Sequence, residues 1–154
     1  MSSKPHRRPG AAPTRGASLV EVLIAVLVLS IGILGIAGLQ ARALQNNDSA
    51  FQRSQAVMLS YFILDAMRAN VAVARSGGYD MEKTCSAVTG GSLAAEDQKT
   101  WMNALKDNLG QANTTCGEIS CDPATSVCTV RVYWDDGRGV GGSSSQMIET
   151  RSRL

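Results

Sequence analysis

Glu21 is the residue of this chain whose type and position most strongly suggest chemistry. It lies near the start of an apolar run that continues to Leu39 and contains no other charged residue. A carboxylate in an apolar segment that crosses a membrane costs about 2.5–3.5 kcal/mol at the bilayer centre, and somewhat less near the end of the segment. A residue in such a position is therefore expected to have both a partner and a function.

The four-residue offset between Ala17 and Glu21 suggests that partner. If the chain is cut after Gly16, the new α-amine at Ala17 lies one helical turn from the Glu21 side chain. The same amine on a neighbouring subunit could also meet Glu21, and the two charges would neutralise each other within an apolar assembly. Cleavage would thus create the counter-ion that the carboxylate needs.

Residues 1–16 are rich in Pro, Gly, Ser and Arg and show no apolar periodicity, which predicts a disordered leader. They carry four cations and no acid, whereas the whole chain has a formal net charge of +2, so the remainder is net acidic and a basic nucleic-acid surface is not expected. Basic residues beside an apolar span keep that end in the cytoplasm.

A secretory signal peptide fits poorly, because its small cleavage-site residues follow the apolar region whereas Gly16 precedes it. An uncleaved anchor leaves Glu21 unexplained.

The ten residues from Gly16 to Ala25, with the sequence GASLVEVLIA, resemble the class III signal of type IV prepilins and pseudopilins. The resemblance implies that a prepilin peptidase cuts after Gly16 and N-methylates Ala17, and that Glu21 is the carboxylate required for assembly. Major pilins usually have Phe at the position of Ala17, so this departure favours a minor component.

The continuation from Leu29 to Gln40, with the sequence LSIGILGIAGLQ, resembles the PilV group of minor pilins, the type IV pilus modification proteins. The resemblance is dense over residues 16–45 and weaker at residues 101–109 and in the C-terminal strand pair. It implies a minor pilin that takes part in initiating pilus assembly, near the filament tip. The implied partners are other minor and major pilins, the prepilin peptidase, the inner-membrane assembly machinery and a tip adhesin. The implied location is the bacterial inner membrane, with a cytoplasmic N-terminus and a periplasmic head, and then the pilus at the cell surface.

The pattern beyond the leader predicts an α+β protein with the type IV pilin fold, in which a long helix packs on a small antiparallel sheet with a short extra helix. No proline occurs between Pro13 and Pro123, so one helix is expected from about Ser18 to Arg75. Residues 17–39 form its transmembrane and filament-core part, residues 40–75 its amphipathic part, and residues 76–154 the head. An apolar stripe at helical spacing is expected to pack against the head; it consists of Leu44, Phe51, Val57, Met58, Tyr61, Phe62 and Leu64.

In the head, residues 76–78 (Ser-Gly-Gly) predict a helix break, followed by a loop to Gly91. A second helix is expected at residues 93–109, ending at Gly110. Trp101, Leu105 and Leu109 share one of its faces, where Trp101 is interpreted as a core anchor rather than a ligand platform, and Glu96 and Asp97 favour its first turn through the helix dipole. Alternating residues predict strands at 127–134 and 146–153.

Four cysteines allow three disulfide pairings, and we favour the sequential one, although a four-cysteine zinc site is the alternative. The sequential pairs are Cys85–Cys116 and Cys121–Cys128. The only histidine, His6, lies in the leader, which removes Ser/His and Cys/His catalysis from the mature chain, so no enzyme, cofactor or metal site is expected. Asp135 and Asp136 could join a calcium site, but the sequence favours solvated turn formers.

Two other functions remain open at this point. A minor pseudopilin of a type II secretion system shares the logic of the leader, and its loss should block enzyme export while surface pili stay normal. A membrane-anchored periplasmic binding domain on an uncleaved anchor should retain residues 1–16 and be indifferent to replacement of Glu21.

Overall fold

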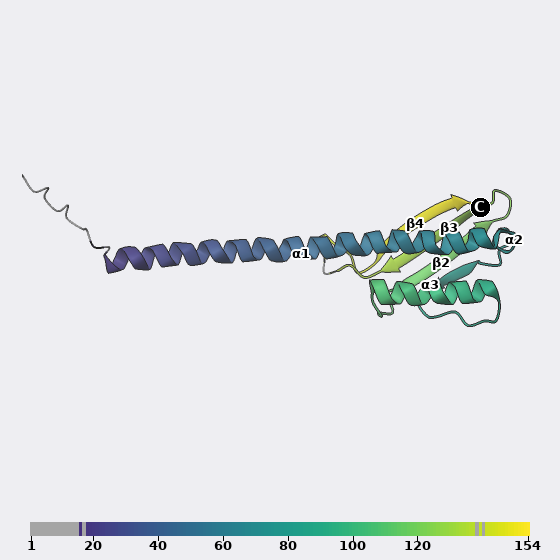
Figure 1. Ribbon diagram of the computed structural model, residues 1–154, viewed down its shortest axis with the longest axis horizontal. Helices are drawn as coiled ribbons and strands as arrows, with labels where there is room; N and C mark the ends of the chain where they lie inside the picture. The colour runs from purple at the N-terminus through teal and green to yellow at the C-terminus, as the bar shows by residue number, and fades with distance from the viewer. Residues whose placement is uncertain (1–15, 17, 138, 140) are drawn as a thin grey trace, which may run out of the picture. The chain divides into compact units, whose positions relative to one another are not determined.

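The computed structural model describes residue 16, residues 18–137, residue 139 and residues 141–154. The protein is α+β, with a long N-terminal helix, a four-stranded antiparallel sheet and a further helix packed into the same core (Figure 1). The chain divides into two compact units, one ending at Gln40 and the other comprising Ala41–Leu154, and each is described by itself.

Helix α1 extends over Leu19–Ala69 and is followed by the short helix α2 at Val71–Arg75. The prediction of one continuous helix to Arg75 is therefore wrong at Asn70, which has φ −124° and ψ 48°. The side chain of Asn70 donates to the hydroxyl of Tyr79 at 3.4 Å. The Asn70 side chain makes no capping hydrogen bond to α2, so the contact seen at the break is the one with the buried Tyr79.

The sheet is a meander in which each strand pairs antiparallel with the next, in the order β1-β2-β3-β4. Its strands are β1 at Met81–Thr84, β2 at Cys116–Asp122, β3 at Val127–Trp134 and β4 at Gln146–Arg153. The sequence pattern predicted β3 and β4 correctly. It missed β2 and placed β1 inside a loop, because β1 has only four residues and β2 contains Gly, Glu, Ser and Asp among its seven.

Helix α3 occupies Leu93–Leu109, as predicted. The side chain of Ser92 accepts a hydrogen bond from the N–H of Ala95 at 3.1 Å and so caps the first turn. Gly110 ends the helix with φ 110°, a conformation that favours glycine. The predicted inward face is also confirmed, because Trp101, Leu105 and Leu109 are buried.

The core of the second unit combines α1, α3 and one face of the sheet. The residues of β3 on this face are buried in alternation, as the strand pattern predicted; they are Cys128, Val130, Val132 and Trp134. A Cβ atom added to Gly117 of β2 would lie 2.6 Å from the Trp101 ring, so only glycine lets the helix approach the strand this closely.

The apolar stripe predicted to pack against the head faces solvent instead. Leu44, Phe51, Met58 and Phe62 have exposed fractions of 69%, 58%, 55% and 46%. Only one of the seven stripe residues, Leu64, lies on the buried face, which consists of Ala56, Leu59, Ser60, Ile63, Leu64 and Met67. The buried face includes the small residues Ala56 and Ser60, so a pattern weighted toward large apolar residues selected the opposite face.

Candidate functional site

The first turn of α1 is built around Ser18 and Glu21. The Ser18 hydroxyl accepts a hydrogen bond from the N–H of Glu21 at 3.2 Å, and the Ser18 carbonyl accepts one from Val22 at 3.2 Å. The sequence Ser-x-x-Glu is the capping-box pattern, a signal that the sequence analysis did not use. Glu21 therefore has a local role at the helix N-terminus, where a negative charge is favourable.

The predicted processing site lies directly before this turn. Gly16 is exposed and belongs to no helix or strand. Ala17 lies outside the described residues, so the predicted cleavage and N-methylation remain predictions.

The first part of α1 is apolar around its whole circumference. Every large apolar side chain from Leu19 to Leu39 is more than half exposed, and no residue of its most apolar 18-residue window is buried. At 1.5 Å per residue this part is about 30 Å long, close to the thickness of a bilayer hydrocarbon core. By length and composition the helix can cross a membrane.

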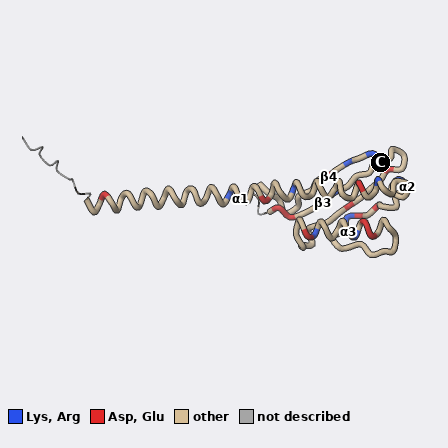
Figure 2. The backbone as a smooth tube through the Cα atoms, viewed as in Figure 1, with Lys and Arg blue, Asp and Glu red and all other residues tan. Residues whose placement is uncertain are grey.

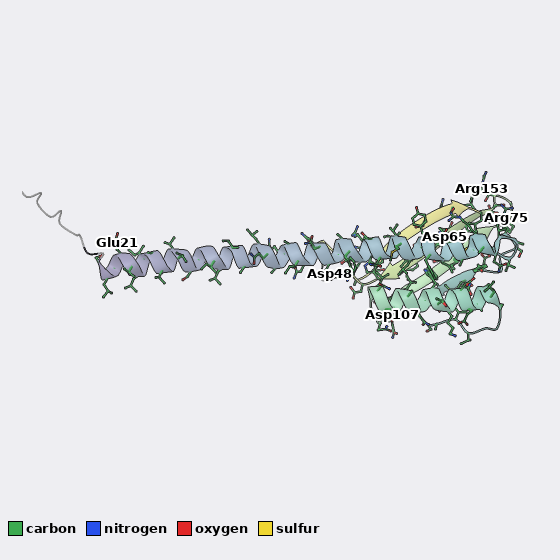
Figure 3. The ribbon with its side chains drawn as sticks, in the orientation of Figure 1. Glu21, Asp48, Asp65, Arg75, Asp107 and Arg153 are labelled. Carbon is green, nitrogen blue, oxygen red and sulfur yellow. A yellow bond between two sulfur atoms is a disulfide. The ribbon has the colours of Figure 1, made fainter. Side chains whose placement is uncertain are left out.

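Glu21, labelled in Figure 3, is the one charged residue of this apolar part, and the next charged residue along the chain is Arg42. Figure 2 shows an acidic position near the start of α1 and a long uncharged stretch of helix after it. The only hydroxyl within it, that of Ser30, donates to the carbonyl of Val26 at 2.6 Å and is satisfied inside the helix. The ion pairs among the described residues all lie between Arg53 and Arg151, in the second unit. Among the described residues, no ion pair includes the Glu21 carboxylate.

Apolar surface continues beyond Gln40 on one side of α1. Leu44, Phe51 and Met58 follow one another at intervals of seven residues, and Phe62 follows Met58 by four. These spacings place the four side chains on a common helix face. In the second unit, α1 therefore has one face in the core and an exposed apolar face, which we call the outer stripe.

Two disulfides hold the head, in the pairing favoured from the sequence. Cys121 and Cys128 are directly opposite each other in the β2–β3 ladder. Cys85 directly follows β1, and Cys116 begins β2. All four cysteines are bonded, which leaves no thiolate for the alternative zinc site.

Asp135 and Asp136 differ in a way that the sequence did not predict. The exposed Asp135 carboxylate accepts from the N–H of Gly137 at 2.8 Å, as expected of a turn residue. The Asp136 side chain is only 3% exposed and lies 4.0 Å from the guanidinium of Arg53, so the prediction of a solvated turn former is wrong there. Its carboxylate accepts from the Ser49 hydroxyl at 2.5 Å and ties the loop after β3 to α1. Among the described residues, no group of three His, Cys, Asp or Glu side chains could hold a metal ion.

The acidic pair at the start of α3 also divides. Glu96 lies in the first turn and pairs with Lys99 at 3.2 Å. Asp97 accepts a hydrogen bond from the buried Tyr79 hydroxyl at 2.5 Å. Burial and this hydrogen bond raise the pKa of Tyr79. Asp97 thus holds Tyr79 in the core, in addition to the predicted dipole role.

A polar ladder crosses the outer face of the sheet. Arg131 on β3 pairs with Glu118 on β2 at 2.5 Å and with Glu149 on β4 at 2.7 Å. The Tyr133 hydroxyl donates to Glu118 at 2.7 Å, and Lys83 on β1 lies 4.0 Å from the Tyr133 ring centre.

The Tyr133 hydrogen bond is the main cause that lowers the pKa of Glu118. Burial, followed by the bond to Glu118, raises the pKa of Tyr133 to about 12. The ladder joins all four strands and pairs its charges within the sheet.

Comparison with known proteins does not assign the chain to a family. No family model matches it, and neither the curated proteins nor the solved structures contain a match.

Proposed function

We propose that this protein is a minor pilin that is processed by a prepilin peptidase and takes part in the assembly of type IV pili. The observation that carries the proposal is the first part of α1, an unburied helix that is apolar all round and has a single carboxylate in its first turn. The fold is compatible with the type IV pilin fold that the N-terminal resemblance implies.

The apolar part of α1 needs an apolar environment, because burial of apolar surface is worth about 25 cal/mol per Å² and its large apolar side chains are all more than half exposed. A bilayer supplies that environment before assembly, and the helices of neighbouring subunits supply it afterwards. The outer stripe of Leu44, Phe51, Met58 and Phe62 extends the same requirement into the second unit.

Glu21 needs a cation in either environment. In the proposed mechanism, cleavage after Gly16 frees the α-amine of Ala17, and the amine of one subunit pairs with Glu21 of its neighbour. A subunit that lacks the pair leaves one charge buried and unneutralised, which sets the register between neighbours. We propose other minor pilins, the major pilin, the inner-membrane assembly machinery and a tip adhesin as partners, because the resemblance of residues 16–45 to minor pilins implies them.

The capping geometry allows a sharp test of this mechanism. Glu21→Gln keeps a side chain suited to the capping box but removes the charge, whereas Glu21→Ala removes both. Ser18→Ala is the matched control, because it removes the cap and keeps the carboxylate. Each variant is expressed in the organism that makes the protein, in place of the unaltered chain. Its amount is then compared between the membrane fraction and sheared surface filaments.

Both Glu21 variants are expected to reach the membrane at normal levels. Their amount in filaments should fall at least about tenfold, which corresponds to a loss of about 1.4 kcal/mol in the free energy of incorporation. Ser18→Ala is expected to assemble. Normal incorporation of Glu21→Gln would contradict the charge-pair mechanism. A defect common to Ser18→Ala and Glu21→Ala, but absent from Glu21→Gln, would reduce Glu21 to a helix cap.

A further inference from the structure

The two edges of the sheet differ in length and regularity. The edge strand β1 has four residues, and its register with β2 shifts between Met81 and Thr84. The other edge strand, β4, has eight residues, and all of them are paired in register with β3. Among the described residues no strand pairs with the outer side of β4, so this side presents unpaired backbone N–H and C=O groups.

The core ends before it reaches β4. All four inward-facing residues of β3 are buried, whereas their partners across the ladder are only partly buried. Those partners on β4 are Gln146, Ile148, Thr150 and Ser152. The inward-facing side chains of β4 are therefore left uncovered on the side of β4 that lies away from β3. A further strand at this place would continue the sheet.

Helix α1 provides an apolar flank along this edge. Arg68 of α1 donates a hydrogen bond to the Ser152 hydroxyl at 2.7 Å, so the helix face that carries Arg68 is turned toward β4. Tyr61 and Val57 precede Arg68 by seven and eleven residues and so share its face. Their exposed fractions are 50% and 38%. Both side chains are therefore available to contact a strand added beside β4.

The outer face of β4 is basic toward its end. Glu149 pairs with Arg131 and Arg151, which satisfies its charge within the sheet. Arg153 is exposed, and none of the ion pairs among the described residues includes it. A strand laid beside β4 would therefore be favoured by acidic side chains on its outer face near Arg151 and Arg153.

We propose that the free edge of β4 binds an extended strand of a different polypeptide, apolar on the side that faces Val57 and Tyr61 and acidic on the side that faces Arg151 and Arg153. Backbone hydrogen bonds would supply the affinity of this strand addition, and the two faces would supply its specificity. The strand-binding edge depends only on residues of the second unit and goes beyond the proposed assembly function, whereas the exclusion of a second copy as its occupant rests on the membrane anchoring in that proposed function.

A second copy of this chain does not fit the edge. Within the second unit β4 runs in the same direction as α1, since Asp136 before β4 contacts Ser49 and Ser152 near its end contacts Arg68. Antiparallel pairing of two β4 strands would therefore point the Ala41 ends of the two helices in opposite directions, which the proposed anchoring of both helices in one membrane does not allow. Parallel pairing would turn one sheet over and set the charged outer face of its β4 against Val57 and Tyr61 of the other copy.

The test uses the full chain in detergent micelles and a fluorescein-labelled synthetic peptide of seven alternating Val and Glu residues. Binding is measured by fluorescence anisotropy, and amide hydrogen exchange locates the site. We expect the peptide to bind and to slow exchange in β4 and not in β1. A peptide with Lys in place of Glu should bind at least about tenfold more weakly, a difference of about 1.4 kcal/mol.

Thr150→Lys is the decisive variant. Thr150 is only partly buried, so a lysine can reach solvent in the free protein, but an added strand would bury its charge. Binding should weaken at least about tenfold, whereas the control Thr100→Lys, at an exposed position of α3, should bind normally. A peptide with N-methyl groups along one backbone edge tests the same contact without altering the protein, and it should not bind.

Three results would overturn the proposal. They are no binding of the Val/Glu peptide, equal binding by Thr150→Lys and Thr100→Lys, or protection of β1 in place of β4. Dimerisation of the chain through β4 without peptide would also overturn it, in favour of a second copy. None of these results bears on filament incorporation of the Glu21 variants, so the two proposals fail independently.

Discussion

The two parts of α1 have the same backbone conformation and opposite surroundings. From Leu19 to Leu39 every large apolar side chain is more than half exposed, although this is the most apolar part of the chain. From Ala56 to Met67 the helix contributes one buried face to a core that includes two tryptophans. The number of apolar residues thus does not show which part of the helix is covered by its own chain.

This difference separates two sources of order. The head is held by its own core, two disulfides and a paired outer ladder, and should fold without the apolar part. The apolar part has hydrogen bonds along its own helix, but no residue of its most apolar 18-residue window is buried among the described residues. In the proposed function it is stabilised by lipid or by neighbouring subunits. Head stability and filament assembly should therefore respond to different substitutions.

Removal of a disulfide is expected to have a large effect on the stability of the head and none on the apolar part. Replacing Cys85 and Cys116 by Ala should lower the free energy of unfolding of the head by about 3.7 kcal/mol, and replacing Cys121 and Cys128 by about 2.5 kcal/mol, because the first pair closes the longer loop. Denaturant unfolding in micelles, followed by tryptophan fluorescence, measures both. The helix of the apolar part should persist in both variants, and its loss together with the head would show that the two parts are not independent.

Matched Leu→Ala substitutions compare the two parts of α1 directly. Leu64 is fully buried, and Leu64→Ala should cost about 2–5 kcal/mol of head stability. Leu27 is 60% exposed, and Leu27→Ala should leave the unfolding of the head unchanged. The same denaturation experiment serves for both variants. A destabilised head in Leu27→Ala would contradict the separation.

The buried carboxylate of Asp136 should have a smaller effect. Asp136→Ala removes a charge-assisted hydrogen bond from Ser49 and should cost about 1.5–3 kcal/mol. Arg53 is half exposed and 4.0 Å away, so Arg53→Ala should cost less than about 1 kcal/mol. Equal losses from the two variants in denaturant unfolding would show that the ion pair, and not the hydroxyl, holds the loop.

The smallest effect is expected on the stability of the head at low pH. The pKa of Glu118 is lowered in the folded head from its usual 4.5, mainly by the Tyr133 hydroxyl. A lowered folded pKa gives stability that is present above the unfolded value and lost as the pH falls through the folded value. Head stability should therefore fall below about pH 4.5, and the fall should be shallower in Tyr133→Phe. Thermal unfolding between pH 6 and pH 3 measures this slope, and Tyr61→Phe, at an exposed position, is the control that should not change it.

The sequence predicted the elements that have a strong local signal. Helix α3 has a serine cap, a glycine stop and a clear apolar face, while β3 alternates strictly, and the bounds of both were predicted correctly. Strands β1 and β2 lack such a signal. β1 is stabilised by pairing with β2, β2 by pairing with β3, and both by the disulfides Cys85–Cys116 and Cys121–Cys128. Such non-local contacts cannot be read from a short stretch of sequence.

The candidate site was predicted less completely than the fold. The isolated carboxylate of Glu21 is visible in the sequence, but the hydrogen bond from the Glu21 backbone N–H to the Ser18 hydroxyl required the helix start to be located. Burial of Asp136 could not be predicted, because it depends on Ser49, 87 residues earlier in the chain. The residues of the outer stripe were predicted to share one helix face, which is correct, and to pack against the head, which is wrong. Helical spacing identifies a face without showing what covers it.

The central claim is that the chain is cut after Gly16 and enters a filament through its apolar helix. Mass spectrometry of the N-terminus of the native protein, taken from both membranes and sheared surface filaments, tests it most directly. The account predicts an N-methylated Ala17 as the first residue in both fractions. A chain that begins at Met1 or Ser2 and is confined to membranes would contradict it and would favour an anchored periplasmic domain.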